Sequence, residues 1–408
     1  MNWTLSCPDG IGDFLLRLPW LFEMERRGWH LQLLAREPTL EAARLVGLTG
    51  SLLPLTCSPY SKKTRRLRDP FAKEIQAISR HHPDLLFFGP SQPSFLEEQL
   101  VEANLPMRLG GFVLKEDFWP SESILPAQVL SSAYDLQVEV RNTDSESMRN
   151  QKAANMLLEE NLCLPSFRME RCPAFAHRSD LPDKFLVVSP GYREGDYFLG
   201  LGVEKWVREL RELEVQTSLD FVFTGSSSEA KANAGILAGL REPDRHQNWT
   251  GQLASLSELA GFLESSKGYV GKDSGTMHLA AALGKPIVAV FGGGHWKRFL
   301  PTGTRAAVLT VEVPCRGCDW RCHLPEPVCV REIPAGSVAA AWRQVISLDQ
   351  DERLVLAFSP GEAAMKVLSV NPQVNFPARK HEERRSKIKA LREEAIKPWW
   401  QRIIPSRR

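Results

Sequence analysis

The sequence of 408 residues lacks several features that mark special classes of protein. No apolar run approaches the ~20 residues that a membrane-spanning helix needs. The first residues contain no basic stretch followed by a long apolar one, so we expect no secretory signal. An excess of one charge is also missing, since 51 Lys and Arg stand against 49 Asp and Glu, a net charge of +2. This composition excludes fibrous, disordered and disulfide-scaffold proteins, and a chain of this length can bury full cores.

The small net charge conceals a basic end of the chain. Residues 379–408 hold eleven Lys or Arg and four Glu, so the rest of the chain carries a net charge of −5. A helix predicted over 382–396, followed by Trp399 and Trp400, would suit an anionic membrane interface. A helix packed on the body of the protein is the alternative. The membrane interpretation predicts a cytoplasmic protein that lies peripherally on the inner membrane.

Short apolar strands alternate with helices of 3.6-residue apolar spacing along both halves of the chain. This order predicts two doubly wound α/β domains with parallel sheets. We place the domains at 1–165 and 183–349, with a basic C-terminal extension over 350–408. Ligands of such domains bind at the carboxyl ends of the strands, here in a cleft between the domains. The predicted strands are 3–6, 30–34, 52–55, 84–88, 185–188, 220–223, 268–270 and 287–291, and the predicted helices are 14–27, 39–46, 71–79, 203–213, 257–263 and 277–283.

The turn between the strand at 268–270 and the next helix carries the most informative residues. Asp273, Ser274, Gly275 and Thr276 lie at the predicted helix start, and His278 lies one turn into the helix. Free N–H groups at a helix start attract anions, and a glycine lets a phosphate approach the backbone. Because Asp and Ser are also ordinary N-cap residues, a capped helix with His278 on the surface is the alternative.

The stretch from residue 273 to residue 292 resembles the signature of glycosyltransferase family 9, the heptosyltransferases of lipopolysaccharide core synthesis. The run Asp-Ser-Gly-Thr-Met-His-Leu-Ala-Ala-Ala-Leu-Gly-Lys-Pro, an apolar strand and Phe-Gly match that family almost throughout. Segments 224–229 and 248–259 and the Gly-Ile-Gly-Asp start at 10–13 resemble further family elements, so the resemblance covers roughly residues 1–345. It implies the GT-B fold and an inverting transferase that uses an ADP-heptose-like donor and needs no metal for catalysis.

The resemblance also implies roles for single residues. Asp13 matches the catalytic base of the family, and its position at a helix start predicts an ionised carboxylate. An ordinary first-turn Asp, stabilised by the helix dipole, is the alternative. Glu229 matches the position that contacts the nucleoside ribose, and a carboxylate can accept a hydrogen bond from a ribose hydroxyl. The donor-binding residues predicted in this way are Gly12, Arg193, Gly225, Glu229, Asp273, Ser274, Gly275, Thr276 and His278.

Two segments near the expected donor site depart from the family pattern. Leu199 stands about where the family has a lysine. The loop after Phe291 reads Gly-Gly-Gly-His-Trp-Lys-Arg, where the family more often has Gly-Pro-Thr-Asp-Pro. Lys297 or Arg298 would substitute for the missing cation, or both are solvated loop charges. These departures leave the donor sugar and its nucleotide open.

Five cations among residues 62–68 form a basic segment in the first half. An exposed loop explains the segment, and so does a clamp for an anionic, lipid-linked glycan acceptor, because Arg binds carboxylates and phosphates bidentately. The segment has no aromatic residues interleaved, and the body of the chain is acidic. We therefore expect no nucleic-acid partner.

Four of the eight cysteines lie within fifteen residues: Cys315, Cys318, Cys322 and Cys329. Without a secretory signal, such a cluster favours metal binding over disulfides. Four thiolates can hold zinc or iron in a tetrahedral site, and several members of the family carry cysteines at this place. We expect a structural metal here, and a set of free thiols is the alternative.

The function that we favour is transfer of a heptose, or a similar sugar, from an ADP-sugar to a lipopolysaccharide core or a related glycan. Two alternatives fit the same sequence. One is a metal-cluster protein that binds a nucleotide without transferase activity. The other is a protein O-glycosyltransferase of the same family.

Overall fold

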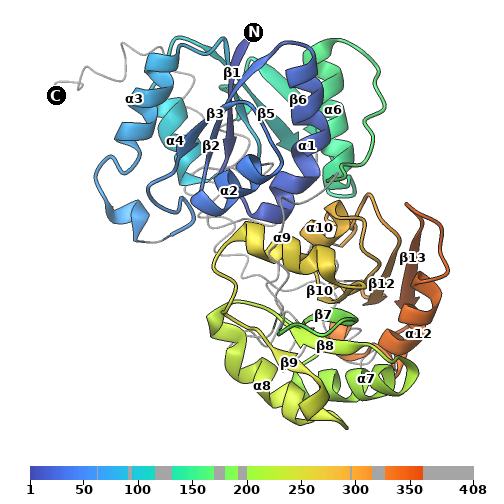
Figure 1. Ribbon diagram of the computed structural model, residues 1–408. Helices are drawn as coiled ribbons and strands as arrows, with labels where there is room; N and C mark the ends of the chain where they lie inside the picture. Colours follow the sequence, from blue (N-terminus) through green and yellow to red (C-terminus); the bar gives the residue numbers. More distant parts are fainter. Residues whose placement is uncertain are drawn as a thin grey trace, which may run out of the picture.

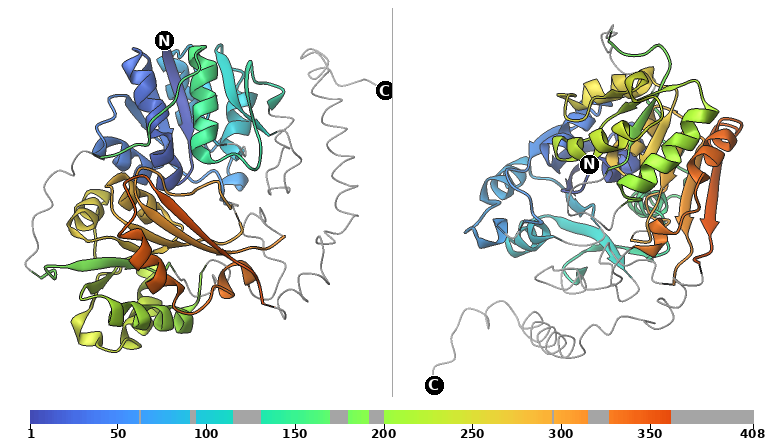
Figure 2. Two further views of the ribbon diagram at one scale, coloured as in Figure 1. Left: turned by 90° about the vertical axis from the view of Figure 1, so that its right-hand side faces the viewer. Right: turned by 90° about the horizontal axis from the view of Figure 1, so that it is seen from below.

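The computed structural model describes residues 1–61, 63–90, 94–114, 131–169, 180–191, 200–294, 296–314 and 327–361. Two α/β units lie against each other, with the first unit above the second in Figure 1 and in the left view of Figure 2. Each unit is built on one parallel sheet. Within the described ranges, no helix combines the length and the hydropathy that crossing a bilayer requires.

The first unit contains a six-stranded sheet in the order β3-β2-β1-β4-β5-β6. Its core lies on both faces of the sheet, with α1, α2 and α6 packed on one face and α3 and α4 on the other. The strands are β1 (Asn2–Cys7), β2 (His30–Ala35), β3 (Ser51–Pro54), β4 (Leu85–Phe88), β5 (Arg108–Leu114) and β6 (Leu136–Val140). The helices are α1 (Ile11–Arg26), α2 (Glu37–Leu45), α3 (Ala72–His81), α4 (Phe95–Glu102) and α6 (Glu146–Leu158).

The second unit contains a seven-stranded sheet in the order β13-β12-β11-β10-β7-β8-β9. Every strand pairs in parallel with its neighbours, which requires a crossover for each connection. The strands are β7 (Phe185–Ser189), β8 (Asp220–Phe223), β9 (Gln247–Asn248), β10 (Tyr269–Lys272), β11 (Ile287–Val290), β12 (Ala306–Val311) and β13 (Arg353–Phe358). The helices are α7 (Val203–Gln216), α8 (Ala230–Ala238), α9 (Leu256–Ser265), α10 (Gly275–Ala282), α11 (Val328–Arg331) and α12 (Ser337–Val345).

The predicted α/β class is confirmed, and each predicted strand and helix overlaps an observed one. Strands β5, β6, β9, β12 and β13 were not predicted. In β5, Gly110 and Gly111 interrupt the apolar pattern. Both glycines are needed for packing: a Cβ on Gly110 would lie 2.9 Å from the Phe87 ring, and one on Gly111 would lie 2.6 Å from the Tyr134 ring. Glycine normally weakens a strand, so the sequence did not predict that β5 pairs with β4 and β6.

Strand β13 lies in the range where we expected a C-terminal extension. It pairs with β12 in continuous register, from Arg353 opposite Ala306 to Phe358 opposite Val311. Its exposure alternates between exposed and half-buried, as expected for the edge of a sheet. These residues therefore belong to the second sheet, whereas the basic tail at 379–408 lies outside the described residues.

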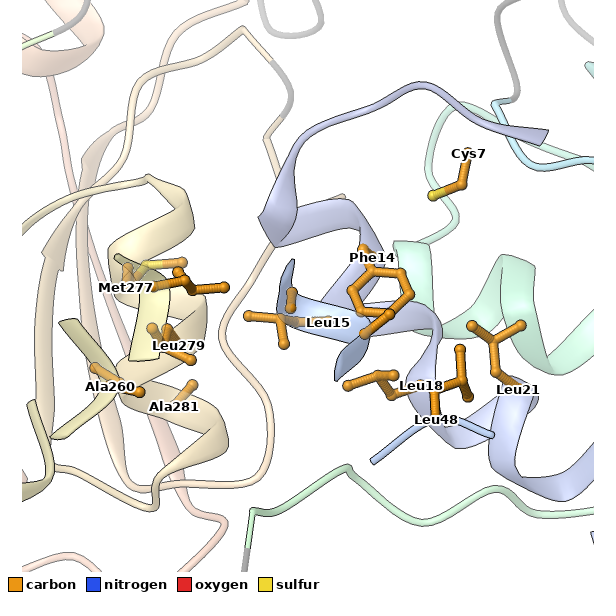
Figure 3. Packing of buried hydrophobic residues seen from close by; sticks show 14 of the residues in the cluster. Cys7, Phe14, Leu15, Leu18, Leu21, Leu48, Ala260, Met277, Leu279 and Ala281 are labelled. Carbon is orange, nitrogen blue, oxygen red and sulfur yellow. The ribbon is translucent and has the colours of Figure 1, made fainter. Parts of the chain in front are cut away.

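A single apolar cluster joins the two units. Figure 3 shows Leu15 of α1 facing Met277, Leu279 and Ala281 of α10, with Ala260 of α9 nearby. Leu15 is only 4% exposed and the others are almost fully buried. Apolar burial of this kind stabilises the contact by ~25 cal/mol per Å². The helices that carry the predicted site are therefore held together by packing.

Candidate functional site

The starts of α1 and α10 face each other between the two units, and each follows a strand inside its sheet, β1 or β10. Two glycines permit this close approach. A Cβ on Gly12 would lie 2.6 Å from Cδ2 of His278, and one on Gly275 would lie 3.6 Å from Cβ of Ile11. Residues separated by about 260 positions in the chain, predicted to work together, thus lie at one site.

The start of α10 has the geometry of an anion site. Ser274 is the N-cap, and its hydroxyl accepts a hydrogen bond from the Met277 amide at 3.4 Å. Gly275 and Thr276 form the first helical positions, whose N–H groups have no partner within a helix. Because the helix end faces α1, these donors and the helix dipole are directed at the space between the two units.

Tyr269 stabilises the turn before α10, and the sequence did not identify it as a site residue. Its hydroxyl donates to the Lys272 carbonyl at 2.9 Å and lies 3.2 Å from Oγ of Ser274. A Cβ on Gly271 would come within 2.5 Å of that hydroxyl. Lys272 in turn donates from Nζ to the carbonyl of Gly191, two residues after β7. A tyrosine in an apolar strand gives no pattern from which this role could be predicted.

The structure distinguishes Asp13 from the neighbouring Asp9. Asp9 is occupied, since one oxygen lies 2.6 Å from Nη2 of Arg17 and the other accepts a hydrogen bond from the Tyr60 hydroxyl at 2.9 Å. The Asp13 carboxylate accepts no hydrogen bond from any residue within the described ranges. It is half-buried at the start of α1 and remains available to a substrate proton.

The charge state of Asp13 differs from the prediction. Burial, and then the negative charge of Asp9, raise the pKa of Asp13 to about 7. The expectation that the helix start keeps this carboxylate fully ionised is therefore wrong, because burial outweighs the dipole. A pKa near neutrality suits a general base, which must both take up and release a proton at the working pH.

A chain of buried charges connects this region to the second unit. Arg17 is fully buried; its Nη2 lies 3.2 Å from Oε1 of Glu146, and its Nη1 donates to Sγ of Cys7 at 3.0 Å. The other oxygen of Glu146 accepts a hydrogen bond from Nε of Arg298 at 2.8 Å. Of the two loop cations that we considered, Arg298 points inward, whereas Lys297 is exposed.

Asp273 and His278 lie at the same helix start but do not form a hydrogen bond, since Nε2 of His278 is 3.9 Å from the Asp273 carboxylate. Burial, and then the charge of Asp13, raise the pKa of Asp273 to about 7. Burial lowers the pKa of His278 to about 4, so its imidazole is neutral at pH 7. The alternative of a surface histidine is wrong, because His278 is only 5% exposed.

Glu229 lies beyond the end of β8, in the loop that begins with Gly225. One of its oxygens accepts hydrogen bonds from the Ser226 amide at 2.6 Å and the Ser226 hydroxyl at 2.8 Å. A Cβ on Gly225 would lie 2.7 Å from that same oxygen. The loop therefore fixes the carboxylate, and its role towards a ribose stays a prediction. Arg193 lies outside the described residues.

Of the predicted metal ligands, Cys315, Cys318 and Cys322 lie outside the described residues. The Sγ of Cys329 lies 3.7 Å from the position that a Cβ on Gly293 would take. Where the chain is described, no group of three or more metal-binding side chains occurs. The metal site stays a prediction.

The chain just before the basic segment contacts Asp9. Tyr60, which bonds to the Asp9 carboxylate, precedes the short 3-10 helix Thr64–Arg66. Arg36 donates from Nη2 to the Asp9 carbonyl at 3.2 Å. The role of residues 62–68 as an acceptor clamp stays a prediction.

Comparison with known proteins bears on the family resemblance. Residues 203–324 match the family described as glycosyltransferase family 9 (heptosyltransferase). Lipopolysaccharide heptosyltransferase 2 of Salmonella typhimurium is 27% identical over 232 residues, covering 51% of this chain and 59% of the relative. Lipopolysaccharide heptosyltransferase 2 of Escherichia coli is 34% identical over 104 residues, covering 25% of this chain and 29% of the relative. The predicted family resemblance is confirmed, over less than two thirds of each relative's length.

Solved structures bear out the predicted GT-B architecture. A glycosyltransferase family 9 protein from Veillonella parvula has a TM-score of 0.64 and 14% identity, covering 85% of this chain and 97% of that one. Escherichia coli heptosyltransferase WaaC, solved with ADP-2-deoxy-2-fluoro heptose, has a TM-score of 0.56 and 18% identity, covering 85% and 99%. At such identities the likeness establishes the fold alone.

Proposed function

We propose that this chain, which carries a glycosyltransferase family 9 domain, transfers a heptose or a similar sugar from an ADP-sugar to a lipopolysaccharide core or a related glycan. One observation carries the proposal. Asp13, in the first turn of α1, and the N-terminus of α10 lie at the same contact between the two units. A general base and an anion site are the two groups that an inverting transfer from a nucleotide sugar requires.

The reaction follows from these positions. Asp13 takes the proton of the acceptor hydroxyl while the acceptor oxygen attacks the anomeric carbon of the donor sugar. The bond from that carbon to the diphosphate oxygen breaks, and ADP leaves with the electron pair. The N–H groups at Gly275 and Thr276 stabilise the negative charge that develops on the diphosphate. Asp13 then gives its proton to solvent.

The neighbours of the anion site support this assignment of the donor. His278 is neutral, so the positive potential at α10 comes from the helix start and from Lys272, which lies beside Asp273 and lowers its pKa. Glu229 and Gly225 lie after β8, the second strand from β10 in the same sheet, where a ribose attached to the diphosphate would reach them. A WaaC structure contains ADP, which makes ADP the first nucleotide to test.

The function is tested by incubating the purified protein with ADP-heptose and lipopolysaccharide from a heptose-deficient strain, and measuring ADP release. We expect release only when both substrates are present. An acceptor-independent rate equal to the complete reaction would contradict the proposal.

The anion site is tested by the change of melting temperature on adding ADP, since a ligand that binds only the folded state stabilises it by RT ln(1 + [L]/Kd). We expect Ser274→Leu to remove most of this shift, because the side chain fills the space at the helix start. Ser255→Leu is the matched control: Ser255 is the N-cap of α9 and accepts from the Glu258 amide at 3.1 Å. Both variants lose a cap worth about 1 kcal/mol. If both keep the ADP shift, the anion site is not at α10.

We also propose that the basic tail holds the protein at the anionic face of the inner membrane. Each Lys or Arg near such a surface is worth ~1 kcal/mol and is screened by salt. Truncation after Gln373 should release the protein from vesicles that contain anionic lipid and leave turnover of a short water-soluble acceptor unchanged. Unchanged vesicle binding, or unfolding of the truncated protein, would remove the membrane role.

A further inference from the structure

Arg298 connects the two units through Glu146, whose other carboxylate oxygen contacts Arg17, one helical turn after Asp13 on α1. It lies in the loop after β11, and its Nε donates to Glu146 at the first position of α6. Its backbone carbonyl also accepts a hydrogen bond from the Glu146 amide at 2.8 Å. The two bonds clamp one residue of the second unit onto a helix start of the first unit.

The clamp is buried and well supported. The Glu146 side chain is 1% exposed and that of Arg298 is 13% exposed. The guanidinium carbon of Arg298 stacks 4.5 Å from the Phe299 ring centroid. Its terminal nitrogens have no hydrogen bond to any residue that the structure describes. Glu146 therefore fixes the guanidinium through Nε and leaves the donors on its two terminal nitrogens unused by the described residues.

We infer that Arg298 is a positioning residue for Asp13: when the two units are together, the clamp to Glu146 sets a cation beside the Asp13 carboxylate and keeps it available as a base. This inference rests on the proposed function and deepens it. On this inference, the protonation state of Asp13 is set by the contact between the two units and not by the first unit alone.

The electrostatic environment supports the inference. The pKa of Asp13 is lowered by the positive charges of Arg17 and Arg298, and raised by burial and by the negative charges of Asp9 and Glu146. Arg298 and Glu146 therefore act on the same carboxylate in opposite directions. The titratable or charged groups near Asp13 are Cys7 at the end of β1, Asp9 in the following turn, Arg17 of α1, Tyr60, Glu146 of α6, Asp273 and His278 at the start of α10, and Arg298.

The test compares two substitutions with opposite expected signs. Arg298→Gln removes a cation, so the acid limb of the pH–rate profile should move up by about one pH unit, as loss of a close opposite charge does. Glu146→Gln removes an anion, so the limb should move down. A merely structural clamp would lower activity in both variants without opposite shifts. Arg298→Lys keeps the charge, loses the Nε bond, and should restore most of the wild-type profile.

A second measurement needs no substrate. A carboxyl group whose pKa is higher in the folded than in the unfolded state makes the folded protein less stable as the pH rises through the folded-state pKa. The fall in melting temperature from pH 6 to pH 8 should therefore be steeper than wild type in Arg298→Gln and shallower in Glu146→Gln. Adding Asp13→Asn to each variant should abolish both differences.

Asp351→Asn is the matched control, since it removes the ion pair of Asp351 with Arg168, which links distant segments away from Asp13. We expect its pH dependence to equal that of the wild type. Shifts of the same sign in Arg298→Gln and Glu146→Gln, or differences that persist without Asp13, would overturn the inference. Absence of transfer in the wild type would overturn the proposed function while the melting experiment still tests the role of Arg298.

Discussion

Replacing Asp13 by Asn should lower the turnover of ADP-heptose by about 10²–10⁴-fold, the usual cost of losing a general base. Asn is nearly isosteric, so α1 and its contact with His278 stay in place. ADP affinity should be equal to or higher than that of the wild type, because a negative charge near the diphosphate has been removed. Steady-state kinetics and ADP titration separate the two effects.

The same variant should be more stable than wild type at pH 8. Burial raises the pKa of Asp13 to about 7, so ionising the carboxylate in the folded protein is unfavourable above that pH. Below about pH 4 the advantage disappears, because the carboxyl is protonated in both the folded and the unfolded chain. Glu204→Gln, which removes an exposed first-turn carboxylate of α7, should change neither turnover nor this pH dependence. Full turnover in Asp13→Asn would refute its assignment as the base.

Replacing Arg17 by Met should reduce the free energy of unfolding by about 3–5 kcal/mol, because removing one partner leaves buried charges uncompensated. Arg17 is fully buried and serves the carboxylates of Asp9 and Glu146 and the carbonyl of Gly89. Met is similar in size to Arg but makes none of these polar contacts. Urea denaturation at pH 7 measures the loss.

Arg26→Met provides the control on the same helix. Arg26 is 65% exposed and pairs with Glu23, one helical turn before it. Exposed pairs contribute about 0.2–1 kcal/mol, so this variant should remain close to wild type. Equal losses in the two variants, or wild-type stability of Arg17→Met, would show that the buried network is not a net support of the fold.

Much of the fold could be predicted from the sequence because alternating strands and helices leave a clear local pattern. The turn from Asp273 to His278 was predicted for the same reason, since its Ser-Gly start and apolar helix are contiguous. Strand β5 was missed because its two glycines serve ring packing and not the strand itself. β13 was missed because an edge strand alternates weakly, and the neighbouring basic tail suggested an extension.

The charges around Asp13 could not be predicted, since they meet only in the folded chain. Glu146 and Arg298 are 152 positions apart. Each alone resembles a solvated residue of a polar segment. Arg17 gives one usable signal: it lies among buried apolar residues of α1, four positions after Asp13. A charged residue at such a position requires buried partners, and the carboxylates are those partners.

The contact between Gly12 and His278 also limits how closely the starts of α1 and α10 can approach. A single methyl group at position 12 would lie 2.6 Å from the imidazole, which is itself enclosed and has little room to turn. The imidazole ring therefore leaves room for the hydrogen atoms of Gly12 but not for a methyl group. Reacting atoms must come within ~3–3.5 Å, and a misplacement of ~1 Å can cost 10²-fold in rate. A larger residue at position 12 would therefore push the start of α1 away from the start of α10, and with it the proposed base away from the proposed anion site.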